Sequence, residues 1–277
     1  CCTVVTAFHS ENVTVNAGTV CNGPVLSGSL SAGDPGATSL DHTDRLGAEP
    51  RRLSVRSHGQ GTPWTSSQLA DKTRSLETSG LLKEFALGEL LGHGSFSIVL
   101  NCRARRDSDA AAAAGPLAAK LIERVDARPE DIEQETQIHV KLHHPNILRV
   151  HRIFTEKCFV CMVLDLCKGG SLASLLGKLH RQVRRPLVAR RMVHVGRQMV
   201  QAVDYIHNLF ITHRDIKADN FLADRHDIAD PDCRVVLADF GFAVECRLGD
   251  RLKRQCGTLG YWSPEVWDKN YALKADV

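Results

Sequence analysis

The chain has 277 residues, of which 43% are hydrophobic, enough for one medium-sized domain with an extension. Its 35 basic and 32 acidic residues leave a net charge of +3, which gives no reason to expect nucleic acid or an anionic membrane surface as the main partner. No apolar run approaches the roughly 20 residues that span a bilayer. The ten cysteines are scattered, which favours a reduced, intracellular protein, cytoplasmic or nuclear, over a disulfide framework.

The first 81 residues differ in composition from the rest. They are rich in Ser, Thr, Gly and Asp, contain few aromatic residues, and show no helical or strand period for more than a few positions. Such a segment buries too little apolar surface to order itself, so residues 1–81 are predicted to be a disordered low-complexity extension. A folded domain is expected over residues 82–277.

The folded part is predicted to begin with two strands joined by a glycine-containing turn. Residues 85–91 read as a strand that runs into Gly92 and Gly94, whose backbone amides can approach an anion closely. Val99 begins the second strand, and its side chain could cover an adenine ring. A pair of glycines alone is a weak signal, because tight hairpin turns also use glycine.

The next two elements are predicted to bring a lysine to a glutamate. Lys120 lies in the apolar strand 117–122, where a cation either points to solvent or reaches an anion inside. Pro129 then starts a helix, and Glu135 falls on its apolar stripe while Glu133 is turned away. A carboxylate that faces a core needs a cation, so Lys120 is expected to pair with Glu135.

A further strand is predicted over residues 158–167, and after it come two loops that carry polar groups. The helix before the first loop has apolar residues at steps of three and four: Val188, Met192, Val195, Met199 and Val203. The loop itself, residues 213–220, contains Asp215, Lys217 and Asn220. The buried strand 235–238 then delivers Asp239 in the second loop.

These groups suit phosphoryl transfer, which depends on positioning and charge neutralisation more than on covalent catalysis. Asp215 would accept the proton of an attacking hydroxyl, and Lys217 would sit on the transferring phosphoryl group. Asn220 and Asp239 supply the oxygen ligands that magnesium prefers.

The ordered set of segments resembles the eukaryotic protein kinase superfamily, serine/threonine type. In that family the catalytic loop reads H-R-D-x-K-x-x-N and the metal loop reads D-F-G, as in residues 213–220 and 239–241 here. The resemblance implies an α+β, bilobal fold with an N-terminal antiparallel sheet, one helix beside it, and a mainly helical C-terminal lobe. It covers residues 82–277, about three quarters of a typical kinase domain, so we expect a C-terminally truncated domain that is inactive alone.

The resemblance also implies ATP and Mg²⁺ as cofactors and a protein as substrate. It implies catalytic roles for Asp215, Lys217 and Thr258, and metal ligation by Asn220 and Asp239. Leu164 would be the gatekeeper, and Asp219 the acid that meets a basic substrate residue. The implied nucleotide-binding residues are Leu91, Gly92, Gly94, Ser97, Val99, Ala118, Lys120, Glu135, Asp165, Cys167, Asn220 and Asp239.

The presumed activation loop, between Gly241 and Gly257, contains no serine, threonine or tyrosine. In the family Arg214 pairs with a phosphorylated residue of this loop. Here the loop is basic, so we expect no activation by its phosphorylation. Asp250, Glu245, or an acidic group of a regulatory partner would replace the phosphate; alternatively, the basic residues are only a solvated face.

Two other functions compete with this one. A pseudokinase-like module that binds nucleotide or partners without transfer is supported only by the unphosphorylatable loop and by Ser97, which stands where the family has a third glycine. A dinucleotide-binding protein is disfavoured, because here the glycine turn leads into a strand and not a helix. Residues 220–222, followed by an Asp-rich insert, resemble the calcium/calmodulin-dependent group of kinases.

Overall fold

The computed structural model describes residues 76, 79–94, 96–105, 115–125, 127–182 and 189–277. The predicted disordered extension over residues 1–81 therefore lies almost entirely outside the described residues, and its boundary stays a prediction. Leu76 and Leu81, at its C-terminal end, are buried in the same apolar cluster as Phe85. None of the helices in the described ranges is both long and apolar enough to cross a bilayer.

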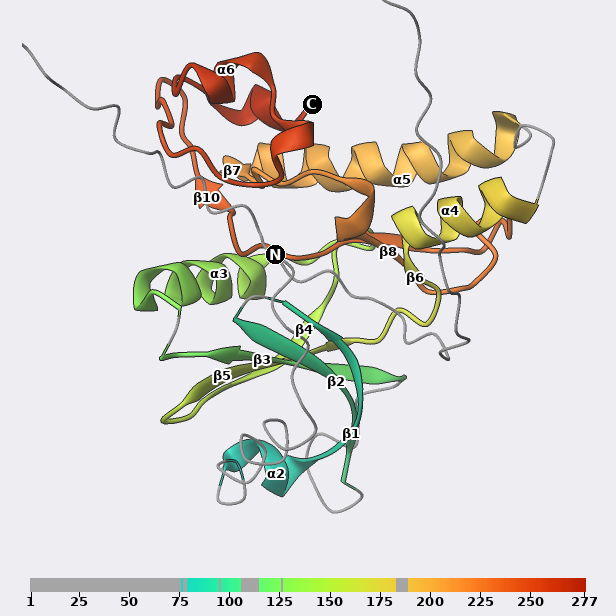
Figure 1. Ribbon diagram of the computed structural model, residues 1–277, viewed down its shortest axis with the longest axis vertical. Coiled ribbons are helices and arrows are strands. Elements are labelled where there is room, and N and C mark those ends of the chain that lie inside the picture. Colours follow the sequence, from blue (N-terminus) through green and yellow to red (C-terminus); the bar gives the residue numbers. More distant parts are fainter. Residues whose placement is uncertain (1–75, 77–78, 95, 106–114, 126, 183–188) are drawn as a thin grey trace, which may run out of the picture. The chain divides into compact units, whose positions relative to one another are not determined.

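Five antiparallel strands form one sheet in the order β1-β2-β3-β5-β4 (Figure 1). They are β1 (Phe85–His93), β2 (Ser97–Ala104), β3 (Leu117–Glu123), β4 (Val150–Thr155) and β5 (Phe159–Asp165). The central strands β3 and β5 are buried at every residue but their last, which explains why their sequences are continuous apolar runs without alternation.

Each face of the sheet is covered by one short helix. On one face, Leu81 of α2 (Gly80–Glu84) lies in a cluster with β1, β2, β3 and β5. On the other face, Ile132 of α3 (Pro129–Lys141) clusters with Ile122 and Met162. Helix α3 begins at Pro129 as predicted, because proline at the first position loses no hydrogen bond and its φ already fits a helix.

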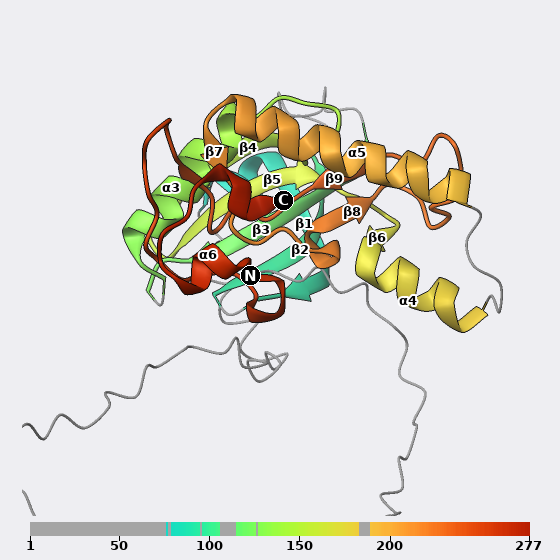
Figure 2. The ribbon, with the colours of Figure 1, turned by 90° about the horizontal axis from the view of Figure 1, so that it is seen from above.

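The second lobe is mainly helical around two small sheets. Its helices are α4 (Leu172–Gln182), α5 (Ala189–Asn208), η2 (Ala218–Asn220), η3 (Leu259–Tyr261), α6 (Pro264–Trp267) and η4 (Leu273–Asp276). Its strands are β6 (Gly170–Ser171), β7 (Ile211–Thr212), β8 (Phe221–Ala223), β9 (Val235–Leu237) and β10 (Val244–Glu245). In Figure 2, α5 lies along β9. Val195 of its predicted apolar stripe is buried in one cluster with Phe221 and Leu237, and Met199 and Val203 of the stripe are partly buried against that cluster. Val188, at the start of that stripe, lies outside the described residues.

A buried carboxylate and three packed aromatic rings hold the two polar loops in place. Asp276 accepts hydrogen bonds from the backbone amides of His213, at 2.7 Å, and Arg214, at 2.8 Å. The ring of Phe240 lies between those of His213 and His139, with centroids 5.1 and 4.6 Å away. The loop after β7 and the loop after β9 are therefore fixed to each other and to α3.

Candidate active site

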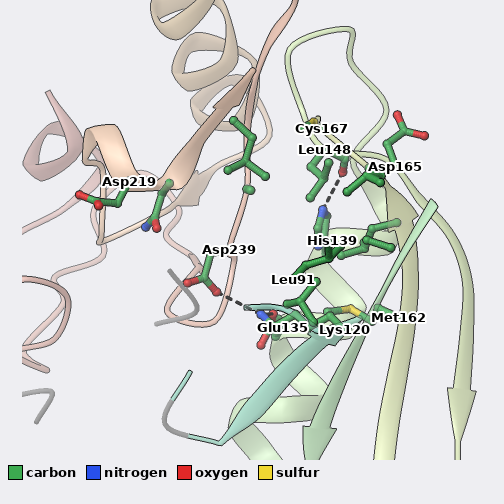
Figure 3. Close-up of a pocket in the computed structure, with 17 residues that line it drawn as sticks. Leu91, Lys120, Glu135, His139, Leu148, Met162, Asp165, Cys167, Asp219 and Asp239 are labelled. Atoms are coloured by element: carbon green, nitrogen blue, oxygen red, sulfur yellow. Dashed lines mark hydrogen bonds and ion pairs between the residues drawn. The ribbon is translucent and has the colours of Figure 1, made fainter. Parts of the chain in front are cut away.

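The cleft at the centre of the site lies between the sheet and the catalytic loop, and encloses about 630 Å³, part of it open to solvent. Nine of the predicted nucleotide-binding residues line it: Leu91, Val99, Ala118, Lys120, Glu135, Asp165, Cys167, Asn220 and Asp239. Figure 3 shows Lys120, Glu135 and Asp239 close together at one end of the cleft and Cys167 at the other.

The glycine turn lies beside the cleft and not in its lining. It is a tight hairpin in which the backbone amide of Gly94 donates to the carbonyl oxygen of Ser97 at 2.7 Å. Ser97 is buried, begins β2 and is in register with Ile122 of β3. The backbone at position 97 is therefore that of a regular strand, which does not require glycine.

The predicted contact between Lys120 and Glu135 is present. Lys120 Nζ lies 2.5 Å from Glu135 Oε1 and 3.1 Å from Asp239 Oδ1, and all three side chains are less than 10% exposed. Two carboxylates thus share one ammonium group inside the protein.

In the two polar loops, three positions have a backbone conformation or surroundings that limit which residue fits. Asp239 and Arg214 adopt left-handed φ values of 61° and 67°, a conformation that costs about 1–3 kcal/mol in non-glycine residues and is found at functional sites. A Cβ atom at Gly241 would lie 3.3 Å from Glu135 Oε2 and 3.5 Å from Asp239 Oδ1. Glycine at position 241 therefore leaves room for both carboxylates.

The second polar cluster is centred on Asp215. Lys217 Nζ donates to Asp215 Oδ2 at 2.9 Å and to Thr258 Oγ1 at 2.7 Å, and the Thr258 hydroxyl donates to Asp215 Oδ1 at 2.7 Å. Asn220 Nδ2 donates to the carbonyl oxygen of Asp215, at 2.8 Å, and to its Oδ2, at 3.1 Å. The structure thus brings all three residues predicted as catalytic into direct contact.

Gly257 holds Thr258 in this cluster. Its φ is 88°, and a Cβ atom there would lie 2.2 Å from the carbonyl oxygen of Arg214. Any side chain at position 257 would therefore push the segment that carries Thr258 away from the catalytic loop.

Asn220 and His139 each place in the cleft a buried side-chain atom that has no hydrogen-bond partner, Asn220 Oδ1 and His139 Nδ1, and of the two the amide oxygen is a ligand that Mg²⁺ prefers. Asn220 is only 2% exposed and lines the same cleft as Asp239. A buried acceptor without a partner costs about 1–3 kcal/mol. No group of three or more His, Cys, Asp or Glu side chains in the described ranges could hold a metal. Mg²⁺ fits this donor set, because it is usually bound by one or two protein oxygens together with water and phosphate.

Sequence reasoning missed His139, which lines the cleft and is 2% exposed. Its Nε2 atom lies 2.7 Å from the carbonyl oxygen of Leu148 (Figure 3). Burial lowers the pKa of His139 to about 4, so the imidazole is neutral near pH 7. The spacing from Glu135 to His139 is one helical turn and could have placed both on one face.

Asp165 also has a role that its sequence position did not indicate. Its carboxylate lies 2.7 Å from His151 Nε2 and 3.2 Å from a guanidinium nitrogen of Arg234. Arg234 immediately precedes β9, so the side chain of Asp165 links the sheet to the second lobe at the edge of the cleft.

The predicted activation loop between Gly241 and Gly257, called the activation segment below, makes different contacts from those expected. Arg214 Nε donates to the carbonyl oxygen of Phe242 at 2.6 Å. Glu245 pairs with Lys141 at 3.6 Å, and Asp250 accepts from the backbone amide of Arg247 at 2.8 Å. The two acids considered as partners for Arg214 are therefore engaged elsewhere.

Comparison with known proteins places the chain in a family. The protein kinase domain family matches residues 85–277, which include both polar clusters. The chain belongs to the protein kinase family, serine/threonine type.

Curated relatives come from animals and plants. The chain is 32% identical over 202 residues to the serine/threonine-protein kinase PLK4 of Drosophila grimshawi, which covers 71% of the chain and 24% of that relative. It is 33% identical over 189 residues to the CBL-interacting protein kinase 4 of Oryza sativa subsp. japonica, covering 67% and 39%. It is 29% identical over 216 residues to the calcium-dependent protein kinase 12 of Arabidopsis thaliana, covering 78% and 41%. The chain thus spans between about a quarter and two fifths of the length of these relatives.

Proposed function

We propose that the protein transfers the γ-phosphoryl group of ATP to serine or threonine hydroxyls of protein substrates. The observation that carries the proposal is the buried cluster of Asp215, Lys217, Thr258 and Asn220 beside a cleft that also holds Lys120 and Asp239. Membership of the protein kinase family supports the same activity.

The lining of the cleft supports a position for the nucleotide. Val99 and Ala118 from the sheet and Leu222 from β8 offer apolar side chains for the two faces of an adenine ring. The backbone of Asp165 and Cys167 would hydrogen-bond the edge of the base, and the Lys120 ammonium group would hold the α- and β-phosphates.

Asn220 and Asp239 are the residues that would hold Mg²⁺. The buried Oδ1 atom of Asn220, which has no hydrogen-bond partner, favours a divalent cation there, and the carboxylate of Asp239 lines the same cleft. Bound Mg²⁺ would neutralise charge on the phosphate oxygens.

Asp215 would accept the proton of the substrate hydroxyl. Lys217 and Thr258 fix its carboxylate by hydrogen bonds to both oxygens, which orients the base before the substrate arrives. Lys217 would also stabilise the charge of the transferring group. A lysine at this position, with Thr258 beside it, favours serine and threonine hydroxyls over tyrosine.

Asp219 would select the protein substrate. It is half-buried and lines the cleft next to Asn220, where its carboxylate can meet a basic residue of a substrate peptide. An acidic regulatory partner at the basic activation segment is the second protein interaction that we propose.

Phosphate transfer from ATP to a generic serine/threonine protein substrate, by the full-length protein, tests the proposal. Asp215→Asn keeps the size of the side chain and removes the base, so kcat should fall by roughly 10²–10⁴-fold while Mg-ATP still binds. Asp232→Asn is the matched control, because Asp232 is exposed and should leave kcat unchanged.

The alternative is a pseudokinase-like module. A folded, full-length protein that binds Mg-ATP but transfers no phosphate would favour it. Ser97 no longer supports that alternative strongly, because the strand backbone at position 97 does not require glycine.

A further inference from the structure

A long-range ion pair joins the activation segment to α3. Arg254 donates two hydrogen bonds to Asp131, from NH1 to Oδ1 at 2.8 Å and from NH2 to Oδ2 at 3.2 Å. The two side chains are 45% and 31% exposed, and the two residues lie 123 positions apart in the chain. A bidentate arginine–carboxylate pair fixes direction as well as distance, unlike a single contact between two charges.

Asp131 lies on the same helix, α3, as Glu135, so its ion pair with Arg254 can affect where Glu135 lies. Asp131 precedes Glu135 by four residues, so the two carboxylates lie on the same side of the helix, one turn apart. A helix of this length moves as a rigid element, and whatever holds Asp131 also restricts where Glu135 can lie. Gln134 Nε2 donates to the carbonyl oxygen of Ala243, which adds a second contact between α3 and the activation segment.

Asp131 is also contacted within its own helix. Arg128, at the N-cap of α3, approaches both Asp131 oxygens at 2.8 to 3.0 Å. Hydrogen bonds from Arg254, and then from Arg128, hold the pKa of Asp131 below its ordinary value despite partial burial. The Arg128 contact is local and cannot position the helix, whereas the Arg254 contact reaches another part of the fold.

No residue between Gly241 and Gly257 can accept a phosphate, since that stretch contains no serine, threonine or tyrosine. The hydroxyl of Thr258 is already hydrogen-bonded to Asp215 and Lys217. Arg254 already has an acidic partner within the chain, Asp131, so this arginine does not need an acidic group from a regulatory protein.

We infer that Arg254 and Asp131 are positioning residues for phosphoryl transfer. Their ion pair holds α3 against the activation segment, so that Glu135 stays on Lys120 without phosphorylation of that segment. The inference rests on the proposed function for its kinetic consequences, whereas the ion pair and its effect on α3 do not depend on catalysis. For Arg254, the simpler alternative of a merely solvated basic face is wrong.

Charge reversal in the full-length protein tests the pair. Arg254→Glu places two carboxylates together, and kcat/KM for ATP should fall by roughly 5- to 20-fold. The double variant Arg254→Glu with Asp131→Arg should recover activity to within about 3-fold of the wild type, because the introduced acid would again face two arginines, one of them Arg128. Arg251→Glu is the matched control: it makes the same charge change three positions away, at an exposed residue whose guanidinium donates only locally, to the carbonyl oxygen of Asp250.

Hydrogen exchange of the α3 amides provides a readout without catalysis. Arg254→Glu should speed their exchange, and the double variant should restore protection. A folded Arg254→Glu protein with wild-type kcat/KM and wild-type exchange would overturn the inference, and so would a folded double variant that recovers neither. If the wild type itself transfers no phosphate, the proposed function fails, and the exchange measurement alone still decides whether the pair holds α3.

Discussion

Helix α3 carries two ion pairs that lie one turn apart and differ in burial. The Lys120–Glu135 pair is almost fully enclosed, with both side chains 8% exposed, whereas Arg254 and Asp131 are 45% and 31% exposed. The inner pair borders the cleft and the outer pair lies at the surface. Lys120 lies 15 residues from Glu135 in the chain and Arg254 lies 123 residues from Asp131, so the two pairs differ in chain separation as well as in burial.

Because of this difference in burial, the two pairs contribute different amounts to the free energy of unfolding. Removing one partner of a buried pair leaves a charge without compensation and costs about 3–5 kcal/mol. An exposed pair contributes about 0–1 kcal/mol, because water and salt screen it. The outer pair can therefore orient α3 without holding the fold together, and the inner pair affects stability and nucleotide binding together.

Lys120→Met should have the largest effect. The change removes the ammonium group that both Glu135 and Asp239 contact, and we expect a loss of about 3–5 kcal/mol of unfolding free energy at pH 7. Phosphate transfer should fall by roughly 10²–10³-fold, because the cation for the phosphates is lost. Denaturant titration and steady-state kinetics measure the two effects.

The exposed Lys253→Met is a matched control, since it makes the same substitution in the activation segment. An unfolding free energy for Lys120→Met equal to that of the control would show that the buried lysine stabilises the fold no more than an exposed lysine does.

A pH titration of stability should reveal His139, which lies one turn beyond Glu135. Burial lowers the folded pKa of His139 from the ordinary 6.5 to about 4. The hydrogen bond to the Leu148 carbonyl oxygen and the nearby Asp239 carboxylate oppose this shift in pKa, whereas Lys120 and His213 add to it. Below pH 6.5 the unfolded chain binds a proton that the folded protein does not, so stability is complete above pH 6.5 and falls as the pH drops toward 4. The total loss from this residue is about 3 kcal/mol.

Denaturant unfolding of the wild type and of His139→Leu, at pH 7 and at pH 4.5, isolates this contribution from the carboxylates that titrate in both proteins. The wild type should lose about 2–3 kcal/mol more than the variant between these two pH values. Parallel losses in the two proteins would mean that His139 titrates normally in the fold.

Glu135→Gln should have a smaller effect on stability than Lys120→Met. Asp239 still pairs with Lys120 at 3.1 Å, so no buried charge loses its only partner, and the cost should be about 1–2 kcal/mol. Activity should fall by roughly 10–100-fold, since Lys120 is no longer held from both sides. Steady-state kinetics at several ATP concentrations would show whether the loss lies in kcat or in KM. Full activity in this variant would leave Asp239 as the sole carboxylate that positions Lys120.

The local parts of this site could be predicted from the sequence, and the long-range parts could not. Pro129 marks the start of α3, and the helical period puts Glu135 on its buried face, so both follow from short-range geometry. Asp276 binds backbone amides more than 60 residues away, and Arg254 reaches Asp131 across 123 residues. A contact of that kind depends on how the segments come together in three dimensions, and no spacing or period along the chain encodes it.

The smallest expected effect is the salt dependence of kcat/KM, which should differ between variants of the two pairs. The Debye length falls from about 10 Å at 0.1 M to about 3 Å at 1 M ionic strength, so an exposed pair weakens with added salt while a buried pair changes little. Asp131→Asn should lower kcat/KM by roughly 3-fold at 50 mM salt and by less than about 2-fold at 0.5 M. The kcat/KM of the wild type divided by that of Glu135→Gln should stay constant over the same range of salt.

Because each ratio of kcat/KM compares two proteins in the same buffer, general effects of salt on substrate binding cancel. A ratio for Asp131→Asn as insensitive to salt as that for Glu135→Gln would mean that the outer pair is shielded from solvent in solution, and burial would no longer separate the roles of the two pairs.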